Sequence, residues 1–126
     1  LISFDGVHGS WCLPVLREAK FVKTIATNAD LRLLLAGAPK LQDLKIEEFP
    51  VDDATLHLFG EKKEFIELDL SPCDNVTEKG LESLYGLQAL KFLTLGGLDR
   101  KAVSNEAIEK LRKTLYHCTI TVDFKE

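Results

Sequence analysis

The residues of this sequence best suited to chemistry are three cysteines, Cys12, Cys73 and Cys118, and the histidine before the last of them, His117. A thiolate acts as a nucleophile or metal ligand when a base or further ligands lie at suitable spacing. No C-x-x-C or H-x-x-x-H pair occurs, and three widely spaced cysteines favour a reducing compartment over a secreted disulfide framework. We therefore interpret Cys73 and Cys118 as structural, with a thiol- or metal-linked regulatory role as an alternative.

Other catalytic motifs are absent from the sequence. It has no G-x-S-x-G elbow, no Walker loop and no G-x-G-x-x-G fingerprint, and Gly96-Gly97 after an apolar run predicts only a bend. The net charge of −4 argues against a nucleic-acid partner, because phosphate binding needs a basic surface. The apolar runs fall short of the roughly 18 residues of a membrane-spanning helix. We expect a non-catalytic protein without cofactor, metal or transmembrane segment.

The elements that must position these residues follow from a repeated pattern. The hexapeptides LQDLKI (41–46), FIELDL (65–70) and LKFLTL (90–95) share the form L-x-x-L-x-L. Their central leucines, Leu44, Leu68 and Leu93, are 24 and 25 residues apart. This spacing lies within the period of a leucine-rich repeat, in which each unit is one strand and a helix or turn. Looser copies occur at 1–4, 21–25 and 119–122.

The segments between these strands have helical patterns. Helices are predicted over 10–18, 29–36 and 53–59, and two more follow Thr77 and Ser104, whose hydroxyls can cap them. Parallel strands joined by helices form a right-handed solenoid. The predicted fold class is α/β: one leucine-rich-repeat solenoid over 1–126, with about six short parallel strands on its concave face and about five helices on its convex face. We place the repeats near 1–20, 21–40, 41–64, 65–89 and 90–117, and the closing strand at 118–124.

The repeat pattern assigns places to the core residues. Leucines of an L-x-x-L-x-L strand point inward, so Leu44, Leu68, Leu93 and Ile120 should form one buried column. The chain turns inward after each strand, and this turn needs a small residue that can be buried and bond to the backbone. Cys73 fits that place, and we expect its thiol to be buried, reduced and unreactive. We assign Cys118, just before the closing strand, to the cap of the solenoid.

The residues between and after the leucines should face outward on the concave sheet. These candidate partner-binding residues are Asp43, Lys45, Glu47, Glu67, Asp69, Ser71, Phe92 and Thr94, with Thr121 and Asp123 at the end of the stack. Four carboxylates in two neighbouring strands would form an acidic band beside an exposed aromatic residue. Only Lys45 would neutralise part of its charge. The band could bind a basic, partly apolar segment of a partner with Phe92 as its anchor. The alternative is that the charges keep an exposed sheet soluble.

The C-terminal half resembles known repeat proteins. LDLSPCDNVTEKGLESLYGLQALKFLTL (68–95) is similar to the cysteine-containing leucine-rich repeat of F-box proteins, in which a strand and cysteine precede Asn-x-Thr and a Gly-Leu helix. GLQALKFLTLGGL (86–98) and VSNEAIEKLRKTLYHCTITVDF (103–124) resemble the ending of the mitochondrial ATP synthase subunit s (coupling factor B) family, which includes the complex I factor named distal membrane arm assembly component two. The resemblance covers 65–124, and ISFD (2–5) resembles the first strand of that family. The sequence departs from the family at Tyr116-His117, where proline and asparagine would stand.

The resemblance implies a non-enzymatic protein on the matrix side of the mitochondrial inner membrane. Such a protein would bind or help assemble a respiratory complex or ATP synthase, and its partner would be a subunit of that complex. The alternative is an F-box-like substrate receptor of a ubiquitin ligase in the cytoplasm or nucleus. Because the chain starts at Leu1 and contains no methionine, we expect it to be part of a longer or processed protein, in which an upstream F-box or presequence would separate the two hypotheses.

Overall fold

The computed structural model describes residues 2–4, 17–22 and 27–125. Strands and helices alternate from the second strand onward. The elements are β1 (Ile2–Phe4), β2 (Glu18–Val22), α1 (Asn28–Gly37), β3 (Asp43–Glu47), α2 (Asp53–Gly60), β4 (Glu67–Leu70), α3 (Glu78–Glu82), β5 (Phe92–Leu98), α4 (Asn105–Thr114) and β6 (Thr119–Phe124).

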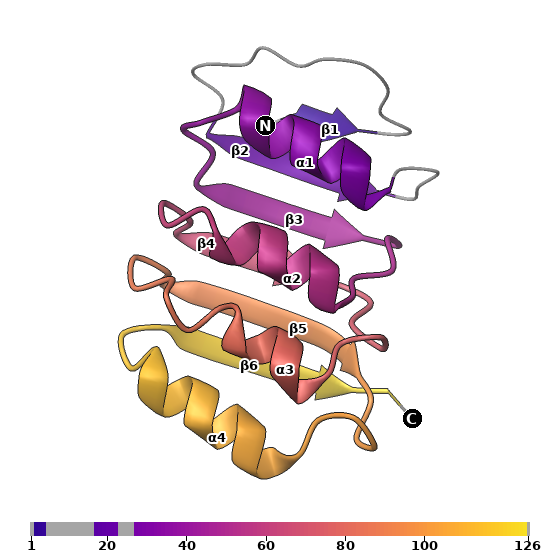
Figure 1. Cartoon of the computed structure of the whole chain (residues 1–126), viewed down its shortest axis with the longest axis vertical. Helices are drawn as coiled ribbons and strands as arrows, with labels where there is room; N and C mark the ends of the chain where they lie inside the picture. The colour runs from indigo at the N-terminus through magenta and orange to yellow at the C-terminus, as the bar shows by residue number, and fades with distance from the viewer. Residues whose placement is uncertain (1, 5–16, 23–26, 126) are drawn as a thin grey trace.

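The strands form one parallel sheet whose order follows the chain from β1 to β6. β1 has only three residues, so β2–β6 make up most of the sheet. Figure 1 shows α1–α4 stacked on one face of this sheet, and their leucines join those of the strands in a single hydrophobic core. The other face, which no described helix covers, is termed the open face. The arrangement is mixed α/β with two layers, as the sequence predicts.

The predicted core column is present. Leu44 pairs with Leu68, Leu68 with Leu93, and Leu93 with Ile120 across neighbouring strands. None of these four side chains is more than 5% exposed. Ala19 of β2 pairs with Leu44 and extends the column by one position. The column forms because alternate residues of a strand point to the same face of the sheet.

The first two units differ from their predictions. The strand predicted at 21–25 starts earlier, at Glu18, and the inward position opposite Leu44 holds Ala19 instead of a leucine. This small residue concealed the repeat pattern. The helix predicted over 10–18 lies outside the described residues except for its last two positions, and Glu18 belongs to β2 and not to a helix. Four helices are therefore seen in the described part of the chain, where five were predicted for the whole.

Hydrogen bonds between successive helix N-termini join the units. In each case the first residue of one helix bonds to the N-cap residue of the next helix. Asn28 Nδ2 donates to Asp52 Oδ1 (3.2 Å), Thr77 N–H donates to Asp53 Oδ1 (2.8 Å), and Ser104 N–H donates to Glu78 Oε2 (2.9 Å). Backbone N–H groups at helix starts lack partners within their own helix. The last two bonds satisfy such groups, while the first joins two side chains. This set of bonds is termed the cap ladder.

One predicted helix cap is wrong and the other is confirmed. The Thr77 hydroxyl donates to Asp53 Oδ2 at 2.5 Å, and it caps no described residue of α3. A carboxylate from the preceding helix therefore replaces the expected local cap. The hydroxyl of Ser104 accepts from the Ala107 N–H at 3.2 Å, as predicted for the N-cap of α4.

Candidate functional site: the open face of the sheet

Cys73 lies in the turn after β4 and is fully buried. Its Sγ donates to the Leu70 carbonyl oxygen at 3.4 Å, and its backbone N–H donates to the Gly96 carbonyl oxygen at 2.8 Å. Burial raises the pKa of the Cys73 thiol to about 12, because an apolar environment disfavours the thiolate. The position and the backbone bond are those expected of a structural cysteine.

The second described cysteine, Cys118, is half-buried. Its Sγ lies 3.7 Å from the Thr119 carbonyl oxygen, and burial raises the pKa of its thiol. The ring of His117 contacts the Tyr116 ring, with centroids 3.9 Å apart. Cys12 lies outside the described residues, and among those that are described no group of His, Cys, Asp and Glu is placed to hold a metal ion. Both described thiols favour the protonated form, which is the less reactive one.

Alternate residues of β2–β6 point to the open face and form rows across the strands. The first row, at the amino-terminal ends of the strands, contains Glu18, Asp43, Glu67, Phe92 and Thr119. The middle row contains Lys20, Lys45, Asp69, Thr94 and Thr121. Toward the carboxyl-terminal ends lie Glu47, Ser71 and Asp123. The structure thus brings the sequence-predicted partner-binding residues onto one face and adds Glu18, Lys20 and Thr119.

Two lysines neutralise part of the open face. Lys45 Nζ lies 3.2 Å from Glu47 Oε1 and 3.8 Å from Asp69 Oδ2. Lys20 Nζ lies 3.7 Å from Glu47 Oε2. The hydrogen bond with Lys45 lowers the pKa of Glu47, and the same bond, with the charge of Asp69, raises the pKa of Lys45. The expectation that only Lys45 neutralises part of the acidic band is therefore wrong, because Lys20 of β2, the strand predicted at 21–25, supplies a second cation.

Three carboxylates of the first row have no such compensation. Glu18, Asp43 and Glu67 are consecutive neighbours across β2–β4, and no described lysine, arginine or histidine forms an ion pair with them. Partial burial and the charge of Glu18 raise the pKa of Asp43. Burial disfavours the ionised carboxylate, and the negative charge of Glu18 disfavours a second negative charge beside it. A cationic group placed over these residues would relieve their repulsion. The three residues are termed the carboxylate row.

An exposed aromatic side chain stands at the end of the carboxylate row. Phe92 pairs with Glu67 and is 52% exposed. Beside it, a hollow of about 650 Å³ opens between the segments that lead into β4, β5 and β6. The hollow is lined by Ile66, Gln88, Ala89, Lys91, Phe92, His117 and Thr119. Tyr116, which is 72% exposed, contacts His117 and extends this aromatic surface. The site is termed the Phe92 hollow.

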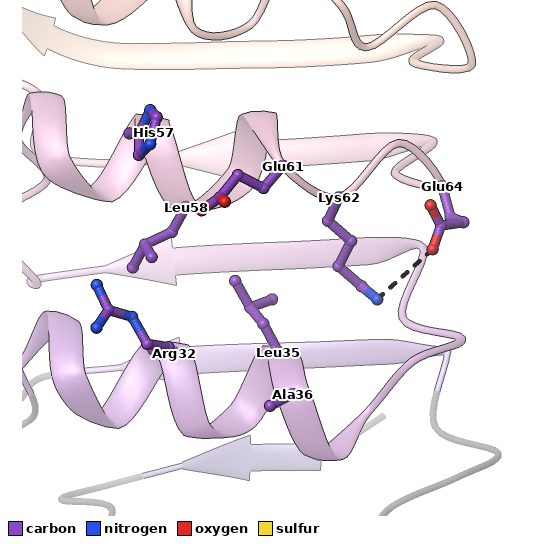
Figure 2. A pocket seen from close by; sticks show the side chains of 8 residues that line it. All are labelled: Arg32, Leu35, Ala36, His57, Leu58, Glu61, Lys62 and Glu64. Atoms are coloured by element: carbon purple, nitrogen blue, oxygen red, sulfur yellow. Dashed lines mark ion pairs between the residues drawn. The ribbon is translucent and has the colours of Figure 1, made fainter.

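A second hollow, of about 640 Å³, lies on the helical side between α1 and α2. Figure 2 shows Leu35 and Ala36 of α1 on one side of it and Leu58 of α2 on the other. Its charged lining consists of Arg32, His57, Glu61, Lys62 and Glu64. Lys62 pairs with Glu64 at 3.8 Å, so this lining mixes both signs and favours no partner of one charge.

Sequence reasoning found Phe92 but missed the rest of the Phe92 hollow. Ile66 and Lys91 each directly precede a strand, and His117 lies two positions before β6. Segments that precede consecutive strands of a repeat structure lie side by side. The repeat period was therefore a signal from which these residues could have been grouped.

No protein-family model matches this chain, and no curated protein sequence matches it. Within the described ranges, no helix has the length and apolar character needed to cross a membrane. Function is therefore inferred from the open face and from the sequence resemblance over 65–124.

Proposed function

We propose that this chain is a leucine-rich-repeat solenoid that acts as a non-catalytic protein-binding module. Three features support the repeat assignment: the parallel strands follow chain order, the column from Leu44 to Ile120 is buried, and a bond of the cap ladder joins each of α1, α2 and α3 to the start of the next helix. Repeat proteins of this kind use the extended surface of their stacked units to bind partners.

The observation that carries the proposal is the carboxylate row that leads to Phe92 on a sheet face that no described helix covers. A basic, partly apolar protein segment is complementary to this surface. Its cations would speed association through long-range attraction, and an apolar contact on Phe92 would supply most of the affinity, as central aromatic residues do in other interfaces.

We further propose, from the resemblance alone, that the partner is a subunit of a respiratory complex or ATP synthase on the matrix side of the mitochondrial inner membrane. An F-box-like receptor would use the same open face for a different partner, so it remains the alternative. The thiol-linked alternative gains no support from Cys73, whose thiol is buried and has a raised pKa.

Retention of partners from a membrane extract tests the proposal. The tagged domain is incubated with detergent-solubilised mitochondrial inner membranes, and retained proteins are identified by mass spectrometry. We expect subunits of one such complex to be retained. Glu67→Lys/Asp69→Lys and Phe92→Ala should each lower their amount about tenfold, the size typical of an interface hot spot. Binding by the charge-reversed variant should also depend less on salt.

A matched control separates the open face from overall charge. Glu61→Lys/Glu82→Lys makes the same charge change at the carboxyl-terminal ends of α2 and α3, where a lysine suits the helix dipole. This variant should retain the partner like the parent. Equal losses in both double variants, or normal retention by both open-face variants, would contradict the proposal. Retention of ubiquitin-ligase components from a cytosolic extract instead would favour the F-box alternative.

A further inference from the structure

We infer that the Phe92 hollow is the anchor site of the open face and takes an apolar side chain that neighbours basic residues in a short extended segment of the partner. The inference rests on the proposed function and specifies the chemistry and length of the segment that binds.

The walls of the hollow suit a large apolar side chain. Ile66, before β4, and Ala89 and Phe92, around the start of β5, supply carbon surface from two separate segments of the chain. Gln88 Nε2 donates to the Tyr85 carbonyl oxygen at 2.9 Å, so this part of the rim is held in place without a ligand. The hollow, of about 650 Å³, is wide and open to solvent, so a side chain can enter it from the open face.

The charges around Phe92 place the basic and apolar residues of the bound segment over different strands. The carboxylate row reaches Phe92 from β2–β4, and Lys91 lies on the hollow side. The lysines of the middle row already pair with carboxylates: Lys20 with Glu47, and Lys45 with Glu47 and Asp69. The carboxylate row is therefore the part of β2–β4 that attracts cations. Basic residues should therefore lie over β2–β4, and the apolar residue over β5 and β6.

The spacing of the strands sets the length of the segment. Neighbouring strands are about 4.8 Å apart, so the row from Glu18 to Phe92 crosses three strand intervals, or roughly 14 Å. An extended chain covers about 3.4 Å per residue. About five residues therefore fit: two or three lysines or arginines, a small residue and one apolar residue. An acidic segment or a nucleic acid would be repelled by the same row.

Titration of the isotope-labelled domain with synthetic peptides tests the inference by NMR. The probe is Lys-Arg-Lys-Gly-Trp-Gly, and the comparison peptide has serine in place of tryptophan. We expect the amide shifts caused by the first peptide to centre on Ala89, Phe92 and Thr119, and its affinity to exceed that of the serine peptide about tenfold. Equal affinities, or shifts without a centre at the hollow, would overturn the inference.

Filling the hollow provides a second test with a matched control. Ala89 is exposed, so Ala89→Trp occupies the hollow without disturbing the core, and dispersed amide signals verify the fold. It should weaken peptide binding about tenfold, whereas Ala89→Ser should not. Full peptide binding by Ala89→Trp would refute the anchor site. The proposed function would still stand in that case if Glu67→Lys/Asp69→Lys lost the membrane partner. Full peptide binding by Glu67→Lys/Asp69→Lys would overturn the requirement for basic residues.

Discussion

The cap ladder predicts that Asp53→Ala and Gly80→Ala act on the same carboxylate. Asp53 accepts the Thr77 N–H at 2.8 Å and the Thr77 hydroxyl at 2.5 Å, and Thr77 does not cap α3 with its own side chain. Loss of a helix cap costs about 0.5–2 kcal/mol, and a bond to a charged group contributes about 1.5–3 kcal/mol. Because Thr77 is exposed and water can replace part of these bonds, Asp53→Ala should lower the free energy of unfolding by about 1–2 kcal/mol.

The change in stability caused by Gly80→Ala should have the opposite sign to that expected from helix propensity. In an isolated helix, replacing glycine by alanine would stabilise the helix by about 1 kcal/mol. Here the new Cβ would overlap Asp53 Oδ1 and lie 3.1 Å from the Asp53 Cα, so the carboxylate must leave its bonds to Thr77. We expect a net loss of about 1 kcal/mol in the parent protein. After Asp53→Ala the carboxylate is absent and only the contact with the backbone of residue 53 remains, so Gly80→Ala should no longer destabilise the protein appreciably.

Urea unfolding of the parent, both single variants and the double variant, followed by circular dichroism, measures this coupling. The change in the free energy of unfolding of the double variant should differ from the sum of the two single changes by about 1–2 kcal/mol. Gly86→Ala is the control, because its Cβ would meet only the flexible end of Lys63, and it should change stability by less than about 0.5 kcal/mol. Additive effects, or stabilisation of the parent by Gly80→Ala, would refute the role given to Asp53.

Three further predictions concern the core, the thiol and the open face. Leu68→Ala should lower the free energy of unfolding by roughly 2–5 kcal/mol through a cavity in the buried column; a loss below about 1 kcal/mol in urea unfolding would contradict that burial. Cys73 should react with a thiol reagent much more slowly in the folded than in the unfolded protein. Because its pKa is raised from 9.0 to about 12, its contribution to stability should be complete below pH 9.0 and lost as the pH rises toward 12. Asp43→Asn should leave the domain as stable as the parent or slightly more stable at neutral pH, since the raised pKa of Asp43 means that its ionised form opposes folding above the ordinary value of 3.8. A marked loss of thermal stability in Asp43→Asn would show that its carboxylate has a stabilising contact instead.

The core and most of the open face were predictable because they depend on local alternation. In a strand, each residue points to the face opposite its neighbour's, so L-x-x-L-x-L alone places Leu44, Leu68 and Leu93 inward and Asp43, Glu67 and Phe92 outward. The repeat period then aligns consecutive strands. The place of Cys73 after its strand followed from the same pattern, and its bond to the Leu70 carbonyl oxygen agrees with it.

Contacts between units could not be deduced in this way. Thr77 has the residue type of a local cap, but Asp53, 24 positions earlier, accepts its N–H and its hydroxyl proton. Lys20 joined the open face only because β2 begins at Glu18, with Ala19 in the place of a leucine. The side chain of a single position does not reveal which neighbouring unit will supply its partner.

Sequence by itself thus determined the strand faces, the period of the units and the sign of the charge on the exposed residues, since each depends on residue type and spacing along the chain. Tertiary structure alone decided which carboxylates are paired and which are not. Lys20 and Lys45 lie within ion-pair distance of Glu47, and Lys45 also reaches Asp69. The carboxylate row, two residues away along each strand, forms no ion pair with a described cation. Tertiary structure also decided the Phe92 hollow, because its walls come from segments separated by whole repeats. Ion pairs and hollows depend on distances across the sheet, and those distances are set when the units stack.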